Sequence, residues 1–463
     1  MNQCFPATRK GFRVSARSRP AGLLSRDGRA WPVMAPRGRF SVFRDREFSV
    51  FFVGYVTSNF GTSMASVALA FAVLHNGGSP TDLSLVLAAR IIPMVLFLLG
   101  GGVLGDRLPR RRVMLVADSV RALSQGTLAL LLMAGPVPLW ILLALASCGG
   151  LGEALFRPSF DGLVPQLAPK DRLPEANALL GMAQSAASVG GPALAGVLVA
   201  VTSAATVLLV DTFSYLVSIG ALLMLRVGDL APDSGKSSMV AELRAGWRAF
   251  SAHTWLWTVT LQFTLFNLVV WAPYLVLGPV SADRDYGGPE AWGLIVGTFG
   301  GGALIGGLLL LGRRPSRPLV VTTLITFLWA APSAALAVRA PLWAVCAAAL
   351  AAGISSAVFN SLWMTTIQQH VPANSLSRVM SYVTFGAYSV GPIGLALAGP
   401  LAESTSVSLV LAVGVGWQIL ANSVVLMLPA VQNLHAPDSD PDKSVTAKPI
   451  ESDESPTSDT SKS

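Results

Sequence analysis

Residues 102–112 read Gly-Val-Leu-Gly-Asp-Arg-Leu-Pro-Arg-Arg-Arg and lie between two long apolar segments. Small residues close the first segment, an acid and a base follow, and a cluster of cations precedes the second segment. Cationic loops between apolar segments stay on the cytoplasmic side of a membrane. This stretch therefore predicts a membrane protein with several spans, and it predicts which side of the membrane the loop occupies.

The composition agrees with a membrane protein along most of the chain. Only 13% of the 463 residues are charged, against about 25% in soluble proteins, and the mean hydropathy is +0.58. A spanning helix needs about 20 mostly apolar residues. The apolar stretches predict an all-α polytopic protein with twelve transmembrane helices, at about 49–74, 83–105, 113–135, 138–158, 177–201, 205–226, 254–280, 291–312, 319–338, 341–364, 378–401 and 406–429.

The net charge of +8 is distributed as expected for a membrane protein. Residues 1–47 carry eleven Lys or Arg and three acids, and most other cations lie in loops on one predicted side. Of all Lys and Arg residues, only Arg284 and Arg339 lie in the loops on the opposite side. The positive-inside rule therefore places both termini in the cytoplasm and the protein in the cell membrane. Because this rule accounts for the basic charge, we expect the lipid bilayer as a partner and no nucleic acid.

The chain is predicted to contain five segments. These are a basic cytoplasmic extension (1–39), an N-terminal six-helix half (40–227), a cytoplasmic linker (228–252), a C-terminal six-helix half (253–430) and a disordered cytoplasmic tail (431–463). The stretch Met-Ala-Pro-Arg-Gly-Arg-Phe from Met34 favours a start of translation there. The alternative is a basic arm that binds anionic lipid.

Sequence landmarks recur between the two halves. Val164-Pro165 and Val371-Pro372 are 207 residues apart, and Gly191-Pro192 and Gly391-Pro392 are 200 residues apart. Nearly constant offsets indicate a duplicated six-helix unit. Two parallel six-helix repeats are typical of major facilitator transporters.

The loop at residues 102–111 also carries a family resemblance. Gly102, Asp106, Arg107, Arg110 and Arg111 match the pattern G-x-L-a-D-r-x-G-r-k of the major facilitator superfamily, and Pro109 replaces its second glycine. Ala-Ala-Arg-Ile-Ile-Pro at 88–93 and Ala-Asp-Ser-Val-Arg-Ala at 117–122 resemble the bacterial branch of macrolide, siderophore and multidrug exporters. The likeness covers about residues 40–430. It implies a monomeric secondary transporter for a small molecule, coupled to protons, with no cofactor.

The predicted fifth span contains a second motif. Gly191, Pro192 and Gly196 resemble the G-P-x-x-G signature of drug/proton antiporters in the same superfamily. The alternative is packing of small residues between membrane helices.

The resemblance gives the loop motif a gating role. Asp106 would face the N-terminal end of the eleventh span, where a helix attracts carboxylates. Arg107, Arg110 and Arg111 would pair with Glu153 or Asp161 near the cytoplasmic end of the fourth span. These contacts would hold the two halves together on the cytoplasmic side and release when the halves rock.

Charges inside the predicted spans are costly and mark candidate functional groups. Arg90 and Asp211 lie at comparable depth, so they are able to pair. The spacings of Asp118 with Arg121 and of Glu153 with Arg157 place each pair on one helix face. Two roles stay open: structural ion pairs near the cytoplasmic surface, or proton coupling through Asp211, Glu153 or Asp118.

The resemblance also predicts the substrate cavity, because spans one, four, seven and ten line it in this superfamily. Aromatic rings and amides on these spans suit a large amphipathic or aromatic substrate. The predicted lining residues are Asn59, Phe60, Gln262, Phe263, Asn267, Trp271, Asn360 and Trp363.

An importer of the same fold is the main alternative, because one fold serves both directions of transport. A membrane-embedded enzyme lacks support: the four histidines are scattered, there is no H-E-x-x-H or G-x-S-x-G motif, and we expect neither catalytic residues nor a metal site. A sensor derived from a transporter is compatible with the polar tail, but nothing requires it.

Overall fold

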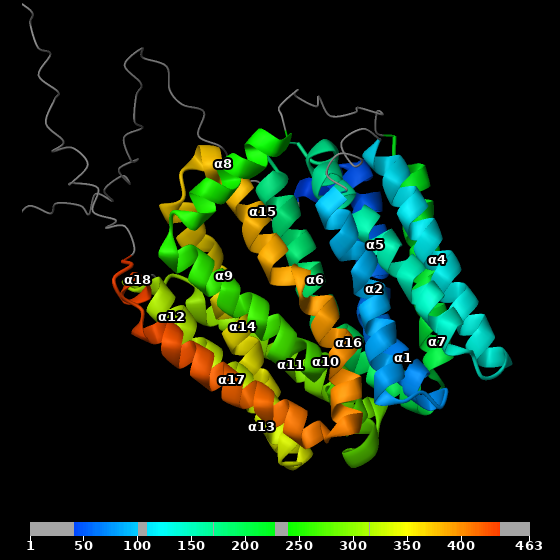
Figure 1. The fold of residues 1–463 in the computed structure, drawn as a ribbon. Helices are drawn as coiled ribbons and strands as arrows, with labels where there is room; N and C mark the ends of the chain where they lie inside the picture. Colours follow the sequence, from blue (N-terminus) through cyan, green and yellow to red (C-terminus); the bar gives the residue numbers. More distant parts are fainter. Residues whose placement is uncertain (1–40, 101–108, 170, 227–238, 314, 436–463) are drawn as a thin grey trace, which may run out of the picture. The chain divides into compact units, whose positions relative to one another are not determined.

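The computed structural model describes residues 41–100, 109–169, 171–226, 239–313 and 315–435. The chain divides into two compact units, Met1–Ser41 and Val42–Ser463, and the architecture below belongs to the second. Throughout the described ranges the secondary structure is helical, without strands (Figure 1). The N-terminal half contains α1 (Arg46–His75), α2 (Pro80–Gly100), α4 (Arg110–Ala134), α5 (Leu139–Leu167), α6 (Leu173–Val201) and α7 (Ala204–Met224).

The C-terminal half is built from the same number of helical runs, three of them interrupted. These runs are α9–η2–α10 (Thr254–Phe266, Asn267–Trp271 and Ala272–Asp285), α11 (Pro289–Leu310), α12–η3–α13 (Pro318–Ile325, Thr326–Trp329 and Ala330–Ala337), α14 (Leu342–His370), α15–α16 (Ala373–Ser389 and Gly391–Ser404) and α17 (Val407–Met427). The remaining helices are α8 (Met239–Ser251) in the predicted linker and the short η1 (Ser41–Arg44) and α18 (Pro429–Gln432).

The twelve predicted spans correspond to these helical runs. Among the described residues, eleven runs are long and apolar enough to cross a membrane, and the 21-residue α2 occupies the remaining position. A chain that crosses lipid as helices satisfies its backbone polar groups internally. The predicted end of the fourth span, at residue 158, is nine residues too early. Pro158 and Pro165 both lie inside α5, since a membrane helix tolerates proline where neighbouring groups satisfy the freed backbone.

The duplication is visible in backbone detail. Thr202 and Thr405, 203 residues apart, end α6 and α16 with nearly identical dihedral angles (φ −128°, ψ −96° and φ −127°, ψ −96°). The serine that follows each threonine caps the next helix, because Ser203 Oγ and Ser406 Oγ each accept a backbone N–H at 3.1 Å. Two equal turns at one offset confirm the repeated six-helix unit.

The halves meet along two pairs of helices. Helix α6 packs against α11, and α2 packs against α16. At the first crossing, a Cβ added at Gly196 would lie 2.6 Å from the Pro289 carbonyl oxygen, and one added at Gly293 would lie 2.6 Å from the Pro192 carbonyl oxygen. Glycine therefore permits the two backbones to touch, as in other membrane helix pairs.

Replacement of this glycine is expected to weaken the crossing. Gly293→Ala forces a methyl group against backbone atoms, and overpacking of this kind costs about 1–3 kcal/mol. The matched control is Gly301→Ala on the same helix, where an added Cβ would meet no atom within 4 Å. We expect a lower thermal unfolding midpoint for purified Gly293→Ala than for Gly301→Ala. Equal midpoints would show that the close approach has no energetic consequence.

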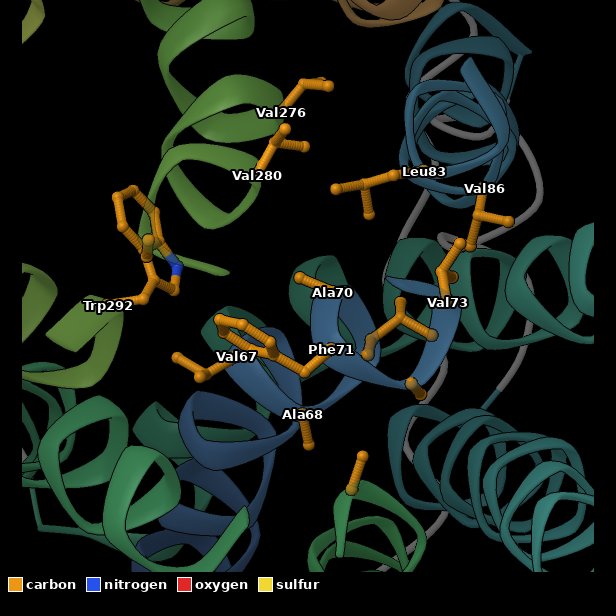
Figure 2. Packing of buried hydrophobic residues seen from close by; sticks show 14 of the residues in the cluster. Val67, Ala68, Ala70, Phe71, Val73, Leu83, Val86, Val276, Val280 and Trp292 are labelled. Carbon is orange, nitrogen blue, oxygen red and sulfur yellow. The ribbon is translucent and has the colours of Figure 1, made fainter. Parts of the chain in front are cut away.

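One end of the bundle is sealed by side chains from both halves. We call it the outer end, because it carries the loops predicted to lie outside the cell. Figure 2 shows Phe71 of α1 and Leu83 of α2 in one buried cluster with Val276 and Val280 of α10 and Trp292 of α11. These apolar side chains close the space between the halves at this end.

Polar contacts reinforce the seal at the outer end. His75 Nε2 lies 3.2 Å from Asp283 Oδ1, and the Thr81 backbone N–H donates to Glu403 Oε1 at 3.0 Å. Deeper between α2 and α16, the Gly399 N–H donates to a side chain of α2. Each of these hydrogen bonds joins one half to the other.

Candidate functional site

Buried and half-buried charges of the N-terminal half form one cluster near the middle of the helices. Arg90 Nη2 of α2 lies 3.4 Å from Glu153 Oε2 of α5. Arg121 Nη1 lies 3.2 Å from Asp118 Oδ1 on α4, as the three-residue spacing predicted. Burial of ions away from water is costly unless they are paired, and each of these four charges has an opposite charge beside it.

Arg121 is held by more than its ion pair. Its Nη2 donates to Thr62 Oγ1 of α1 at 3.2 Å, and its guanidinium carbon lies 5.0 Å from the ring centre of Phe156 and 4.5 Å from that of Tyr215. Stacked cations of this type are stabilised by the electron-rich ring faces. Thr62 also shares a 3.0 Å hydrogen bond with the Tyr215 hydroxyl, so α1, α4, α5 and α7 are tied together at one level.

Asp211 of α7 differs from the other two acids of the cluster because no cation lies within ion-pair distance of its carboxylate among the described residues. It is 1% exposed, and its Oδ2 accepts a hydrogen bond from Gln125 Nε2 at 3.2 Å. Ser214 Oγ lies 3.3 Å from the other carboxyl oxygen. Within the described parts of the chain, its carboxylate forms no ion pair.

Two expected pairings are absent from this geometry. Glu153 contacts Arg90 of another helix instead of Arg157, which shares its own helix and is exposed. Arg90 therefore does not pair with Asp211. Glu153 also lies mid-helix rather than near the cytoplasmic surface, because α5 continues to Leu167. A half-buried carboxylate gains more from a half-buried guanidinium than from a side chain that water already solvates.

The predicted gating motif is only partly described. Gly102, Asp106 and Arg107 lie outside the described residues. Arg110 and Arg111 contact neither Glu153 nor Asp161, in contrast to the expectation.

Both arginines donate instead to backbone carbonyl groups. Arg110 donates to the Gly162 carbonyl of α5. Arg111 donates to the carbonyls of Leu222 at 2.7 Å and Leu223 at 2.9 Å. The last carbonyls of a helix have no partner within it, and α7 ends at Met224. Arg111 therefore provides a donor for the Leu223 carbonyl and a second donor for that of Leu222, which also accepts the Leu225 N–H at 3.3 Å.

The glycine-proline motif of α6 lies at helix contacts. A Cβ added at Gly191 would lie 2.6 Å from the Ser63 Cβ of α1, and both Gly196 and the Pro192 carbonyl contact Gly293 of α11. Small-residue packing accounts for this placement, while an antiporter role for the motif stays a prediction.

The C-terminal half contains a cavity of about 240 Å³ that we call the aromatic cavity. Its walls combine aromatic rings with amides and carry no charged side chain. It is lined by Gln262, Phe263, Phe266, Asn267, Trp271, Phe299, Thr326, Trp329, Ser356, Phe359, Asn360, Tyr388 and Gln418. Five of the predicted residues are therefore together: Gln262, Phe263, Asn267, Trp271 and Asn360.

Two irregular helix turns line the aromatic cavity. The π-helical turn η2 contributes Asn267 and Trp271, and the 3₁₀ turn η3 contributes Thr326 and Trp329. Such turns free backbone groups, and Gln418 Nε2 donates to the Thr326 carbonyl at 2.9 Å. Irregular turns inside helices occur often at functional sites.

The other predicted lining residues lie elsewhere. Asn59 lines a second cavity in the N-terminal half, and its Nδ2 has no hydrogen-bond partner among the described residues. Phe60 packs against Gly190 of α6. Trp363 is buried against Trp255, with ring centres 5.9 Å apart. Neither Phe60 nor Trp363 lines either of these cavities.

Several residues of the cluster were not among those predicted from the sequence. Tyr215 and Ser218 follow Asp211 at helical spacing, four and seven residues later, and Ser218 Oγ donates to Asp118 Oδ2 at 2.7 Å. Gln125 follows Asp118 by seven residues. A polar stripe with this period inside an apolar span predicts a shared buried face, and this signal was available in the sequence.

Comparison with known proteins identifies the family. A family profile described as transmembrane secretion effector matches residues 37–458. The chain belongs to the transmembrane secretion effector family of the major facilitator superfamily. It is 23% identical over 395 residues to macrolide efflux protein A of Streptococcus pyogenes, with coverage of 83% of this chain and 95% of that protein. It is 28% identical over 396 residues to the multidrug efflux pump Tap of Mycolicibacterium fortuitum, with coverage of 82% and 95%.

Solved structures support the same fold for this secretion effector family member. A bacterial homologue of the iron transporter ferroportin, in an inward-facing state, superposes with a TM-score of 0.65 at 18% identity, and the match covers 82% of this chain and 98% of that one. A POT family transporter gives a TM-score of 0.65 at 13% identity, with coverage of 83% and 96%. The protein is a multi-pass membrane transporter for small molecules and not an enzyme.

Proposed function

We propose that this transporter exports drug-like or secondary-metabolite compounds across the cell membrane in exchange for protons, as a monomer with both termini in the cytoplasm. The aromatic cavity carries the proposal. Its walls place rings and amides around about 240 Å³ without a fixed charge. Such walls favour amphipathic, aromatic substrates over small charged nutrients.

Export and proton coupling have separate support. The relatives named above are a macrolide efflux protein and a multidrug efflux pump, which favours export over import. The N-terminal half holds Asp118, Glu153 and Asp211 inside its spans. Carboxylates inside membrane helices are the usual groups of proton relays in transporters.

Alternating access is supported by the contacts at the outer end. Apolar packing and the His75–Asp283 hydrogen bond close that end, so a substrate would enter the aromatic cavity from the inner end in this state. Rocking of one six-helix repeat against the other would then open the outer end. The α6–α11 and α2–α16 pairs would be the contacts about which the halves move.

The proposed function is tested by accumulation of ethidium and erythromycin in cells that express the protein. Each compound is measured with and without a protonophore, against cells that carry the empty vector. We expect lower accumulation, with the difference abolished by the protonophore. Higher accumulation than in the control cells would show uptake and contradict export, and a decrease that survives the protonophore would contradict proton coupling.

The loop motif is expected to control opening of the inner end. Asp106→Asn and Arg107→Ala remove the groups that would hold the halves together there, so we expect export to be largely lost while the protein still inserts. Membrane abundance on immunoblots and ethidium efflux from loaded cells are measured together. Normal efflux in both variants would contradict the gating role.

A further inference from the structure

We propose that Glu153, paired with Arg90, is the carboxylate at which protons enter and leave the transporter, whereas Asp118 and Asp211 act inside the cluster without direct exchange. This inference rests on the proposed proton-coupled transport. It selects one of the three acids that the sequence predicted as alternative groups for proton coupling. The observation that supports this assignment is the position of Glu153 between two cavities.

The first of these cavities lies between the halves, on the outer-end side of Glu153, and we call it the interhalf cavity. Its volume is about 360 Å³. Helix α1 lines it with Ser66, Val67, Leu69 and Ala70, and α5 lines it with Gly150. Trp292 and Leu395 of the C-terminal half complete its wall.

The second cavity, which we call the inner cavity, has a volume of about 130 Å³. Helix α1 lines it with Tyr55, Ser58 and Asn59, and α5 lines it with Phe156, Arg157, Phe160 and Asp161. Because α1 runs toward the outer end and α5 runs away from it, all these residues lie on the inner-end side of Glu153.

Glu153 and Thr62 line both cavities. They mark the level at which the two spaces adjoin, beside Arg90 in the interhalf cavity and Arg121 in the inner cavity. The Glu153 side chain is 28% exposed and that of Arg90 19%. The Glu153 carboxylate is therefore reachable from both sides of this level.

The other two acids are enclosed. Asp118 is 0% exposed and is held by Arg121 and Ser218. Asp211 is 1% exposed, and a Cβ added at Gly61 of α1 would lie 2.6 Å from its Oδ1, so α1 covers it. Neither acid lines the interhalf cavity or the inner cavity.

The charges that surround Glu153 give a reason for it to take up a proton. Arg90 faces it from α2, and Arg121 of α4 and Tyr55 and Thr62 of α1 line the inner cavity with it. Behind Arg121 lie Asp118 of α4 and Tyr215 of α7, and Asp211 lies one helical turn before Tyr215. With every acid ionised, the cluster comprises two cations, Arg90 and Arg121, and three carboxylates. Arg157 and Asp161 are exposed in the inner cavity and add one charge of each sign. One proton therefore neutralises the cluster, which removes an excess charge from the membrane interior.

The proposed step is a balanced proton exchange. A proton from the outer side binds a carboxylate oxygen of Glu153, and the ion pair with Arg90 is lost. The proton then leaves toward the inner cavity, and the carboxylate pairs with Arg90 again. No other bond forms or breaks. Arg90 lines the interhalf cavity, so loss of its ion pair with Glu153 would alter the charge at the wall between the halves.

Carboxyl labelling of the wild-type protein tests the assignment directly. The probe is N,N′-dicyclohexylcarbodiimide, an apolar reagent that attaches to protonated carboxyl groups, and the labelled residue is identified by peptide mass spectrometry. We expect labelling of Glu153 that is lost at alkaline pH, with Asp118 unlabelled as the internal control. Labelling of Asp118 or Asp211 in place of Glu153, or no labelling of Glu153 at any pH, would overturn the assignment.

Transport by variants separates this inference from the proposed function. Glu153→Gln should lose ethidium transport driven by a pH gradient but keep movement down an ethidium gradient. The matched control is Glu290→Gln, at an exposed acid in the first turn of α11, which should keep both. If the wild type shows no gradient-driven transport, the proposed function fails. If the wild type shows gradient-driven transport and Glu153→Gln shows the same transport, only the inference on Glu153 fails.

Discussion

Arg121→Ala is expected to lower the yield of folded protein more than any other single substitution considered above. The change leaves Asp118 ionised and 0% exposed, with Ser218 as its one remaining hydrogen-bond partner among the described residues. Loss of one partner of a buried ion pair costs about 3–5 kcal/mol, a large share of a typical stability of about 5–15 kcal/mol. Purified yield and the thermal unfolding midpoint measure the effect.

Two variants show whether the lost pairing is the cause. Arg157→Ala removes the same charge from an exposed position of α5 and should leave the midpoint nearly unchanged. Asp118→Asn combined with Arg121→Gln removes both charges and should recover part of the loss. A midpoint for Arg121→Ala equal to that of Arg157→Ala would contradict the structural importance of the pair.

Trp329→Ala is expected to raise the ethidium concentration that gives half-maximal export by about tenfold, which corresponds to about 1.4 kcal/mol. The Trp329 ring centre lies 5.1 Å from that of Trp271 and 5.2 Å from those of Phe266 and Phe299. Aromatic pairs contribute about 0.5–1.5 kcal/mol each, so the ring both shapes the wall and offers a face to the substrate. Initial export rates over a range of ethidium concentrations measure the effect.

The controls separate binding from folding. Trp343→Ala removes the same ring from a position that is 75% exposed at the surface of α14 and should leave the half-maximal concentration unchanged. Trp329→Phe keeps a ring and should retain most of the affinity. An unchanged half-maximal concentration in Trp329→Ala would remove the aromatic cavity as the substrate site.

Much of the fold could be predicted because the membrane limits the possibilities. Apolar length predicts helices, and the basic loops predict their direction. Helix ends were harder to predict. The fourth span was predicted to end at residue 158, but α5 continues to Leu167. The turns η2 and η3 interrupt spans whose sequences read as uniformly apolar. Contacts with other helices decide such features, and a single span does not encode them.

The site was predictable only in part, for the same reason. The Asp118–Arg121 pair follows from spacing on one helix. The partner of Glu153 lies on another helix, 63 residues earlier in the chain, and local spacing wrongly favoured Arg157. The cavity residues were assigned to one central space, but Asn59 and Gln262 line separate cavities. Sequence gives the polarity of a span, whereas rotation of its helix decides what each residue faces.

The most direct measurement uses purified protein in liposomes without ATP. An acidic lumen provides the proton gradient, and ethidium, a permanent cation that an acidic lumen does not trap by protonation, reports transport. Protein-free liposomes are the control. We predict accumulation of ethidium in the acidic lumen that requires the protein and disappears when a protonophore collapses the gradient. Equal ethidium movement with and without the gradient would contradict proton-coupled export.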